Sequence, residues 1–245
     1  MQVLILAGGL GKRLRPLVND RPKPMALVDD KPFLEYQLEY LRANGFQNVV
    51  FCLGYLHEQV EAYFGDGSRW NLKIDYSIEM ERLGTGGALK LAERYVQGTF
   101  LTLNGDSFFE VDLDRLVRFH RRQMDTAPAG GYLGSLALTH VEEIGNYGSV
   151  TLNGGKRITG FYEKTDRRVA GQNGLPQVNA GIYVLEPAIF DLIPASQQVS
   201  IEKEVFPALL GGGKLGGCPL DGFFVDIGTP EGYQAFREYQ KERML

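Results

Sequence analysis

The chain has 245 residues, of which 44% are hydrophobic and 23% are charged, and its formal net charge is −4. This length is sufficient to bury a large core, and we expect one domain over 1–245 rather than two small ones. The acidic balance argues against a nucleic-acid-binding protein, which would carry a basic excess.

The chain opens with an apolar run over 3–6, which predicts a buried strand, followed at once by a glycine-rich, basic turn. Gly8, Gly9 and Gly11 let the backbone bend sharply and bring its N–H groups close to a ligand. Five cations occupy twelve positions here: Lys12, Arg13, Arg15, Arg21 and Lys23. A basic loop after a strand favours a small polyphosphate ligand, and a solvated charge run is the alternative.

Two familiar phosphate-binding loops are excluded at this turn. In the P-loop pattern, Leu6 and Arg13 stand where a glycine and a Ser or Thr are required. The dinucleotide pattern G-x-G-x-x-G fits Gly9 and Gly11 but fails at Leu14.

The first half of the chain then alternates between helix and strand. Apolar spacing predicts helices over 34–45 and 56–64, and strands over 48–53 and 73–78. A glycine-rich connection over 84–88 opens a helix with the sequence LKLAERYV, and a strand over 99–103 runs into Asn104-Gly105-Asp106. This order predicts an α/β fold with a mainly parallel sheet flanked by helices.

The second half is richer in short β-prone segments and is expected to be partly antiparallel. After a helix around 113–120, strands are predicted over 130–138, 149–152, 157–162, 178–185 and 223–225. Ser200 is a predicted N-cap, and Thr229 with Pro230 opens the last helix. The polar stretch 166–175 is expected to be a mobile surface loop.

Cysteine and histidine usage favours a reduced, cytoplasmic protein without a histidine-based metal site. Cys52 and Cys218 form no CxxC motif, and the three histidines are dispersed. We predict no signal peptide and no membrane span, because no stretch approaches the ~20 apolar residues that a span needs.

Two aspartates, Asp106 and Asp226, each follow an apolar strand. Carboxylates at the ends of neighbouring strands can share a hard cation such as Mg²⁺, although a single Asp after a strand is usually a turn or cap residue. The turn 84–88 could contact the edge of a nucleobase through its backbone, or simply connect a strand to a helix. Asn179 interrupts an apolar strand and needs a partner, either a sugar hydroxyl or a neighbouring backbone group.

Seven motifs, in order and over nearly the whole chain, resemble those of the sugar-phosphate nucleotidylyltransferases. They are GGLGKRLRP at 8–16, PKPM at 22–25, LGTGGAL at 83–89, NGDSFF at 104–109, EK at 163–164, NAGIY at 179–183 and VDIGTPEGY at 225–233. The resemblance implies a Rossmann-like fold of the nucleotide-diphospho-sugar transferase type with a β-rich sugar-binding part. It assigns 1–110 mainly to the nucleotide and 130–228 mainly to the sugar phosphate.

The resemblance also implies substrates, a cofactor and roles. A nucleoside triphosphate, GTP favoured, and a sugar 1-phosphate would give a nucleotide-sugar and pyrophosphate with Mg²⁺. The implied catalytic residues are Arg13, Lys23, Asp106 and Asp226, with both aspartates as metal ligands. The implied nucleotide-binding residues are Leu6, Ala7, Gly8, Gly9, Gly11, Lys12, Arg13, Glu79, Gly84 and Thr85. The implied sugar-phosphate-binding residues are Gly148, Glu163, Lys164 and Asn179.

Within the family, the motifs at 83–89 and 104–113 most resemble guanylyltransferases of manno-configured sugars, the heptose type before the mannose type, and then small uridylyltransferases. Thr165 replaces a frequent proline, which bears on the sugar side. We expect a stand-alone catalytic domain and leave its oligomeric state open.

A non-catalytic nucleotide-sugar sensor is one alternative to this enzyme. A glycosyltransferase using Asp112-Leu113-Asp114 as its metal motif is another, but that triplet opens a predicted helix.

Overall fold

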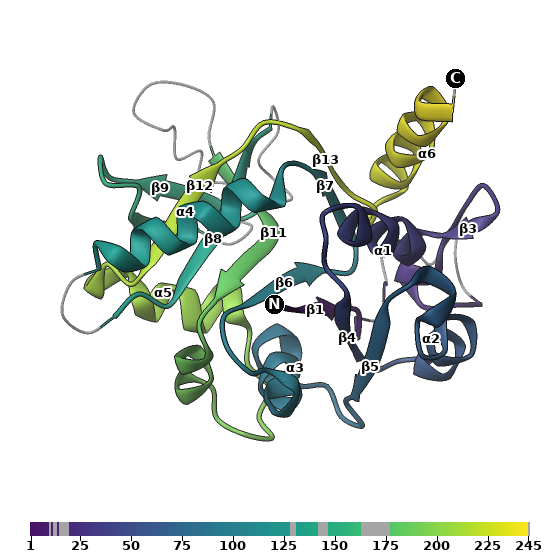
Figure 1. Ribbon diagram of the computed structural model, residues 1–245, viewed down its shortest axis with the longest axis horizontal. Coiled ribbons are helices and arrows are strands. Elements are labelled where there is room, and N and C mark those ends of the chain that lie inside the picture. The colour runs from purple at the N-terminus through teal and green to yellow at the C-terminus, as the bar shows by residue number, and fades with distance from the viewer. Residues whose placement is uncertain are drawn as a thin grey trace.

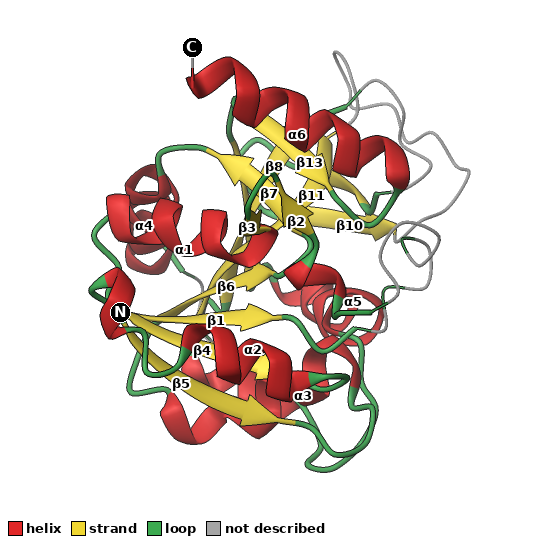
Figure 2. Ribbon diagram, turned by 90° about the vertical axis from the view of Figure 1, so that its right-hand side faces the viewer, coloured by secondary structure: helices red, strands yellow, loops and turns green. Residues whose placement is uncertain are grey.

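The computed structural model describes residues 1–9, 11, 14, 20–127, 131–141, 147–162 and 177–244. A twisted sheet crosses the molecule and helices cover both of its faces (Figures 1 and 2). The strands of this sheet are β1 (Gln2–Leu6), β4 (Asn48–Leu53), β5 (Lys73–Ile78), β6 (Phe100–Asn104), β8 (Gly134–His140), β9 (Ser149–Leu152), β10 (Ile158–Tyr162), β11 (Gln177–Leu185) and β12 (Leu215–Pro219).

The sheet has a parallel half and a largely antiparallel half. Its order is β10-β9-β11-β6-β1-β4-β5, with β8 also pairing with β11 and β12 pairing with β8. β6, β1, β4 and β5 are mutually parallel, whereas β11 is antiparallel to β6, β8 and β9. The prediction of a mixed α/β sheet is therefore confirmed, and four parallel strands end at the same edge.

Alternation along β1 explains why the sheet carries helices on both faces. Val3 and Ile5 are buried on one face with the helices α1 (Phe33–Ala43), α2 (His57–Phe64) and α4 (Leu113–Asp125). Leu4 is buried on the other face with α3 (Gly84–Ala92) and α5 (Phe206–Leu209). A strand covered on both sides reads as a continuous apolar run, as this one does.

Two small antiparallel sheets and the last helix complete the fold. β7 (Ser107–Glu110) pairs with β13 (Phe223–Asp226), and β2 (Leu27–Val28) pairs with β3 (Lys31–Pro32). α6 (Pro230–Met244) packs beside β13, where Phe236 joins a third core with Phe33 and Phe108. Short turns of helix lie at η1 (Lys23–Met25), η2 (Ser68–Trp70), η3 (Glu93–Tyr95), η4 (Pro187–Leu192), η5 (Ile201–Val205) and η6 (Leu210–Gly212).

Several boundaries differ from those that the sequence predicts. α3 begins at Gly84, inside the predicted connection, and β8 covers Gly134–His140 rather than 130–138. β7 and β12 were not predicted at all. The expected loop over 166–175 lies outside the described residues. In the described part of the chain, no helix combines the length and the apolar character that crossing a bilayer requires.

Candidate active site

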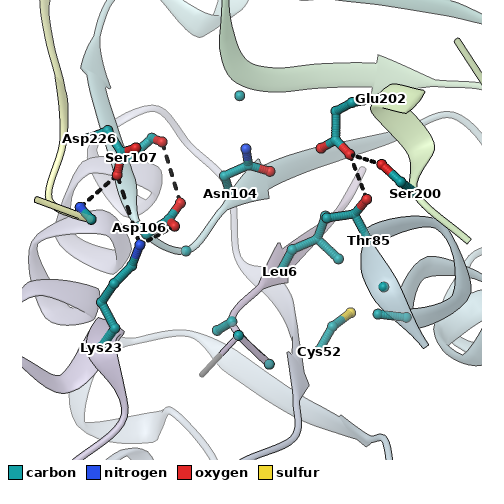
Figure 3. A pocket seen from close by; sticks show the side chains of 18 of the residues that line it. Leu6, Lys23, Cys52, Thr85, Asn104, Asp106, Ser107, Ser200, Glu202 and Asp226 are labelled. Atoms are coloured by element: carbon teal, nitrogen blue, oxygen red, sulfur yellow. Dashed lines mark hydrogen bonds and ion pairs between the residues drawn. The ribbon is translucent and has the colours of Figure 1, made fainter. Parts of the chain in front are cut away.

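The carboxyl ends of the parallel strands surround one cavity of about 620 Å³. β1 leads into Ala7, Gly8 and Gly9, β5 into Glu79, and β6 into Asp106. Figure 3 shows part of this cavity. Thirteen residues given a role by the family resemblance line it: Leu6, Ala7, Gly8, Gly9, Gly11, Lys23, Glu79, Gly84, Thr85, Asp106, Gly148, Asn179 and Asp226. Lys12, Arg13, Glu163 and Lys164 lie outside the described residues.

Two of the three glycines of the first turn leave no room for a side chain. A Cβ at Gly8 would lie 2.7 Å from the Glu79 carboxylate and 3.3 Å from the Gly54 nitrogen. Gly11 has φ +58°, and a Cβ there would lie 2.7 Å from the Lys23 Cβ. No atom of the described residues lies within 4 Å of a Cβ built on Gly9. This stretch of backbone is therefore open to a ligand on one side and closely packed on the other.

Two acids and one lysine meet at one end of the cavity (Figure 3). The Lys23 ammonium group donates a hydrogen bond to Asp106, and its Nζ lies 3.9 Å from Asp226 Oδ1. The Lys23 and Asp226 side chains are only 11% and 13% exposed. Because both carboxylates lie at the same ammonium group, their oxygens already converge on the position of a cation.

Asp226 does not lie at the end of a strand next to β6, where the sequence predicts it. Its strand, β13, is not a neighbour of β6 in the main sheet but pairs with β7, which places Asp226 opposite Ser107. The Ile227 N–H donates to the Asp106 carbonyl oxygen (2.9 Å) and fixes the two acids together. Asp226 also has a turn role, because its Oδ1 accepts the Gly228 N–H at 2.6 Å.

A third carboxylate, that of Glu79, lies at the other end of the parallel strands, after β5 and beside the start of α3. Glu79 Oε2 accepts the Leu83 N–H at 3.0 Å, and burial raises the pKa of this side chain. Gly84 follows with φ +69°, and a Cβ there would lie 2.5 Å from the Val199 carbonyl oxygen. The three glycines of this turn are part of the helix because residues 197–201 pack directly against its backbone.

Gly148 and Asn179, assigned to the sugar phosphate, are neighbours. The Asn179 N–H donates to the Gly148 carbonyl oxygen at 2.8 Å. The Asn179 amide donates to the Tyr183 hydroxyl and accepts the Gly181 N–H, so it has protein partners in addition to its place on the cavity wall. Both alternatives for Asn179, a structural role and a ligand contact, are therefore compatible with its position.

Sequence reasoning missed several residues of the wall, among them Arg82, Asn104, Ser107, Gln198, Ser200, Glu202, Lys203 and Phe224. Ser200 was recognised only as a cap, and its Oγ does accept the Lys203 N–H. Cys52 also lines the cavity, but burial raises the pKa of its thiol to about 12, so it is no nucleophile at neutral pH.

The triplet Asp112-Leu113-Asp114 is the start of α4 and does not line the cavity. The Asp112 side chain accepts the N–H groups of Asp114 and Arg115, which is the bonding of an N-cap. Within the described ranges, no three His, Cys, Asp or Glu side chains gather as a metal site, so Asp106 and Asp226 form a pair only.

The model of the family described as nucleotidyl transferase matches residues 2–242. The chain belongs to the nucleotidyl transferase family. This transferase is 37% identical over 239 residues to the D-glycero-alpha-D-manno-heptose 1-phosphate guanylyltransferase of Campylobacter jejuni, which covers 96% of this chain and 98% of that protein. It is 39% identical over 243 residues to the protein of the same name from Aneurinibacillus thermoaerophilus, covering 99% and 98%.

Other relatives are longer. The mannose-1-phosphate guanylyltransferase of Mycobacterium tuberculosis is 36% identical over 236 residues, which cover 95% of this transferase but 62% of that protein. Among solved structures, HddC from Yersinia pseudotuberculosis has a TM-score of 0.80 and 31% identity, covering 97% of this chain and 98% of HddC. HddC complexed with GMP-PN has a TM-score of 0.78, with the same identity and coverage.

Proposed function

We propose that the transferase moves the guanylyl group of GTP onto D-glycero-α-D-manno-heptose 1-phosphate and releases pyrophosphate. The observation that carries this proposal is the single cavity in which the glycine turn, Lys23 and the pair Asp106 and Asp226 meet. The choice of substrates is supported by the two heptose 1-phosphate guanylyltransferases, which match almost the full length of both chains.

This reaction needs positioning and charge neutralisation rather than a general base. The attacking phosphate oxygen of the sugar is already an anion at neutral pH. It forms a bond to the α-phosphorus, while the bond from that phosphorus to the bridging oxygen breaks and its electron pair leaves with pyrophosphate. Lys23 would neutralise the α-phosphate or the incoming sugar phosphate. Arg13, with Lys12 beside it in sequence, would neutralise the leaving group, because a guanidinium binds phosphate oxygens in pairs.

Asp106 and Asp226 are the residues that would hold Mg²⁺. Their carboxylate oxygens both lie near one ammonium group, and this supports a cation site between them. Two carboxylates suit Mg²⁺, which usually completes its coordination with water and phosphate oxygens. When bound, the ion supplies Lewis-acid stabilisation of charge at the α-phosphate.

The base and the sugar would lie at separate parts of the cavity. Glu79 and the backbone at Gly84 face the proposed base site, with Thr85 beside them, and a carboxylate suits guanine because its ring N–H and amino group are donors. Gly148 and Asn179, with Glu163 and Lys164, would bind the sugar phosphate. In this proposal residues 1–110 mainly bind the nucleotide and residues 130–228 mainly bind the sugar phosphate. The two buried, free cysteines support a reducing, cytoplasmic setting.

Mannose 1-phosphate is the second candidate for the acceptor, supported by the identity to the mannose-1-phosphate guanylyltransferase relatives. We place it second because those proteins are longer than this chain, which spans 62% of their length.

Pyrophosphate release tests the proposal directly. The purified protein is assayed with Mg²⁺, each common nucleoside triphosphate, and either heptose 1-phosphate or mannose 1-phosphate. We expect the highest kcat/KM with GTP and the heptose, and a loss of 100-fold or more in Arg13→Ala, the scale of losing a fixed charge donor. Preference for UTP or mannose 1-phosphate would replace the proposed substrates. No pyrophosphate from any pair would leave a nucleotide-sugar sensor as the explanation.

A further inference from the structure

The carboxylate of Glu202 is a buried acid in the cavity wall to which neither the sequence motifs nor the proposed reaction gives a role. It belongs to η5, the turn Ile201–Val205, and is 8% exposed. The other carboxylates of this wall are Glu79 beside the proposed base site and the pair Asp106 and Asp226 beside Lys23. Glu202 lies apart from that pair, across the cavity (Figure 3).

Two hydroxyl groups fix the orientation of this carboxylate. Glu202 Oε2 accepts a hydrogen bond from Thr85 Oγ1 at 2.6 Å and from Ser200 Oγ at 3.0 Å. Thr85 Oγ1 in turn accepts the Ile201 N–H at 2.9 Å, so the hydroxyl hydrogen of Thr85 is directed to Glu202. Oε1 has no hydrogen-bond partner among the described residues and is turned into the cavity (Figure 3). One oxygen of this carboxylate is therefore fixed by hydrogen bonds, and the other can accept a hydrogen bond from a ligand.

Phosphate groups cannot be that ligand, because they offer acceptors and negative charge. The position of η5 favours the sugar over the nucleobase. Phe206, directly after η5, packs edge-on against Tyr183 with ring centroids 5.1 Å apart. The Tyr183 hydroxyl accepts the amide N–H of Asn179, a residue proposed to bind the sugar. These two buried rings lie behind the cavity wall and connect η5 to the proposed sugar side.

We infer that Glu202 accepts a hydrogen bond from a hydroxyl group of the sugar 1-phosphate and thereby selects the sugar. This inference rests on the proposed function and adds a specificity residue to it. The part of the sugar 1-phosphate that faces Glu202 must carry a hydroxyl group. An apolar group there would leave the buried carboxylate without a partner. Thr85 and Ser200 then act as positioning residues for the carboxylate.

Glu202→Gln tests the inference sharply, because the two hydroxyls also determine how a glutamine would lie. Both donate, so the amide oxygen takes the place of Oε2 and the NH₂ group points into the cavity. The acceptor offered to the sugar becomes a donor. We expect KM for the sugar 1-phosphate to rise about 10- to 100-fold, as for losing a hydrogen bond to a charged group, with KM for GTP unchanged.

A series of sugar 1-phosphates that each lack one hydroxyl identifies the contact. One deoxy compound should be a poorer substrate than the parent for the wild-type protein but an equal one for Glu202→Gln. Glu204→Gln is the matched control, since Glu204 is an exposed acid of the same turn that does not line the cavity, and the amide oxygen of a glutamine can still accept the Ser200 N–H that Glu204 Oε1 accepts at 2.8 Å. A rise in KM for GTP alone, or no deoxy compound whose penalty disappears in Glu202→Gln, would overturn the inference.

Ser200→Ala keeps the test decisive if Glu202→Gln does not fold. It removes one of the two hydroxyls that hold the carboxylate and costs about 1 kcal/mol of capping. KM for the sugar should rise and KM for GTP should not; an unchanged KM for the sugar contradicts the inference. If the wild-type protein forms no pyrophosphate, the proposed function itself is wrong. If the wild-type protein is active and Glu202→Gln has the same KM for the sugar 1-phosphate, only the role of Glu202 is wrong.

Discussion

The ammonium group of Lys23 donates a hydrogen bond to the carboxylate of Asp106 and lies 3.9 Å from an oxygen of Asp226. The lysine thus occupies the space between the two acids proposed to hold Mg²⁺. A lysine and a divalent cation would compete for the same carboxylate oxygens, so if Asp106 and Asp226 hold Mg²⁺, as proposed, Lys23 would have to leave them and its ammonium group would be available to phosphate oxygens. The same side chain would then act on the substrate only once the metal is in place.

The first prediction concerns metal binding without nucleotide. In Lys23→Ala the two acids lose the contact with this ammonium group, and Mn²⁺, as a spectroscopic substitute for Mg²⁺, should bind about fivefold more tightly, the factor for an ion pair of about 1 kcal/mol. Turnover should nevertheless fall by about 100-fold, because a charge donor is lost. Titration of free Mn²⁺ by electron paramagnetic resonance measures the affinity.

Lys31→Ala is the control for Lys23→Ala. Lys31 pairs with Glu39 at 2.6 Å, is 43% exposed and does not line the cavity. Its removal should change neither Mn²⁺ affinity nor turnover. Equal or weaker Mn²⁺ binding by Lys23→Ala would mean that the lysine does not compete with the metal.

The second prediction concerns Glu79 and pH. Burial raises the pKa of Glu79, so the folded protein keeps this proton to a higher pH than the unfolded chain does. The free energy of unfolding therefore decreases as pH rises from the ordinary glutamate pKa, about 4.3, through that of Glu79. Glu79→Gln should be more stable than the wild type at pH 7, and the difference should vanish at about pH 4. Urea unfolding at both pH values measures it.

KM for GTP gives an independent reading of the same side chain, and it should rise in Glu79→Gln because an acceptor for guanine is altered. The exposed Glu81 provides Glu81→Gln as a control for removing one negative charge from the same loop. A stability difference between Glu79→Gln and wild type that is the same at pH 4 and pH 7 would contradict the assignment.

The third prediction concerns the packing of α3 on residues 197–201. Gly84→Ala places a side chain at φ +69° and a Cβ 2.5 Å from the Val199 carbonyl oxygen, which also accepts the Gly86 N–H. The left-handed backbone alone costs about 1–2 kcal/mol, and the contact adds to it. The free energy of unfolding should fall by at least that amount, and KM for GTP should rise.

Gly98→Ala is the control for Gly84→Ala, because in the part of the chain that the structure describes no atom lies within 4 Å of a Cβ built there. Its free energy of unfolding should stay within about 0.5 kcal/mol of the wild type. If both variants were equally stable by urea unfolding, the close contact at Gly84 would not be a constraint on the fold.

Local patterns were sufficient for the elements that are buried on both faces. The strand over 48–53 has the predicted bounds because it is apolar and buried along nearly its whole length. The strand over 73–78 also has the predicted bounds, but the signal there was the alternation of polar and apolar residues. β12 escaped prediction because its sequence, LGGCP, has two glycines and a proline; it is a strand only through its pairing with β8. β7 likewise exists through its pairing with β13.

The candidate site shows the same division. The motifs pointed to the glycine turn, Asp106 and Asp226, and the family resemblance added Glu79; all of these line one cavity. They did not point to Glu202, because its orientation depends on Thr85, a residue far away in the sequence. A serine cap is visible in a local pattern, but the direction in which the next acid points is decided by tertiary packing.

The pairing of β13 with β7 has a consequence for how the protein matures during synthesis. The parallel strands and Asp106 are present once the ribosome has passed the first half of the chain, but the second acid, Asp226, is made only with β13, a strand far from β7 in the sequence. A nascent or truncated chain that stops before β13 could form most of the sheet and yet hold a single acid opposite Lys23. The proposed metal site would therefore be complete only after β13 has paired with β7. The time at which the protein begins to bind the divalent ion would then report the end of folding.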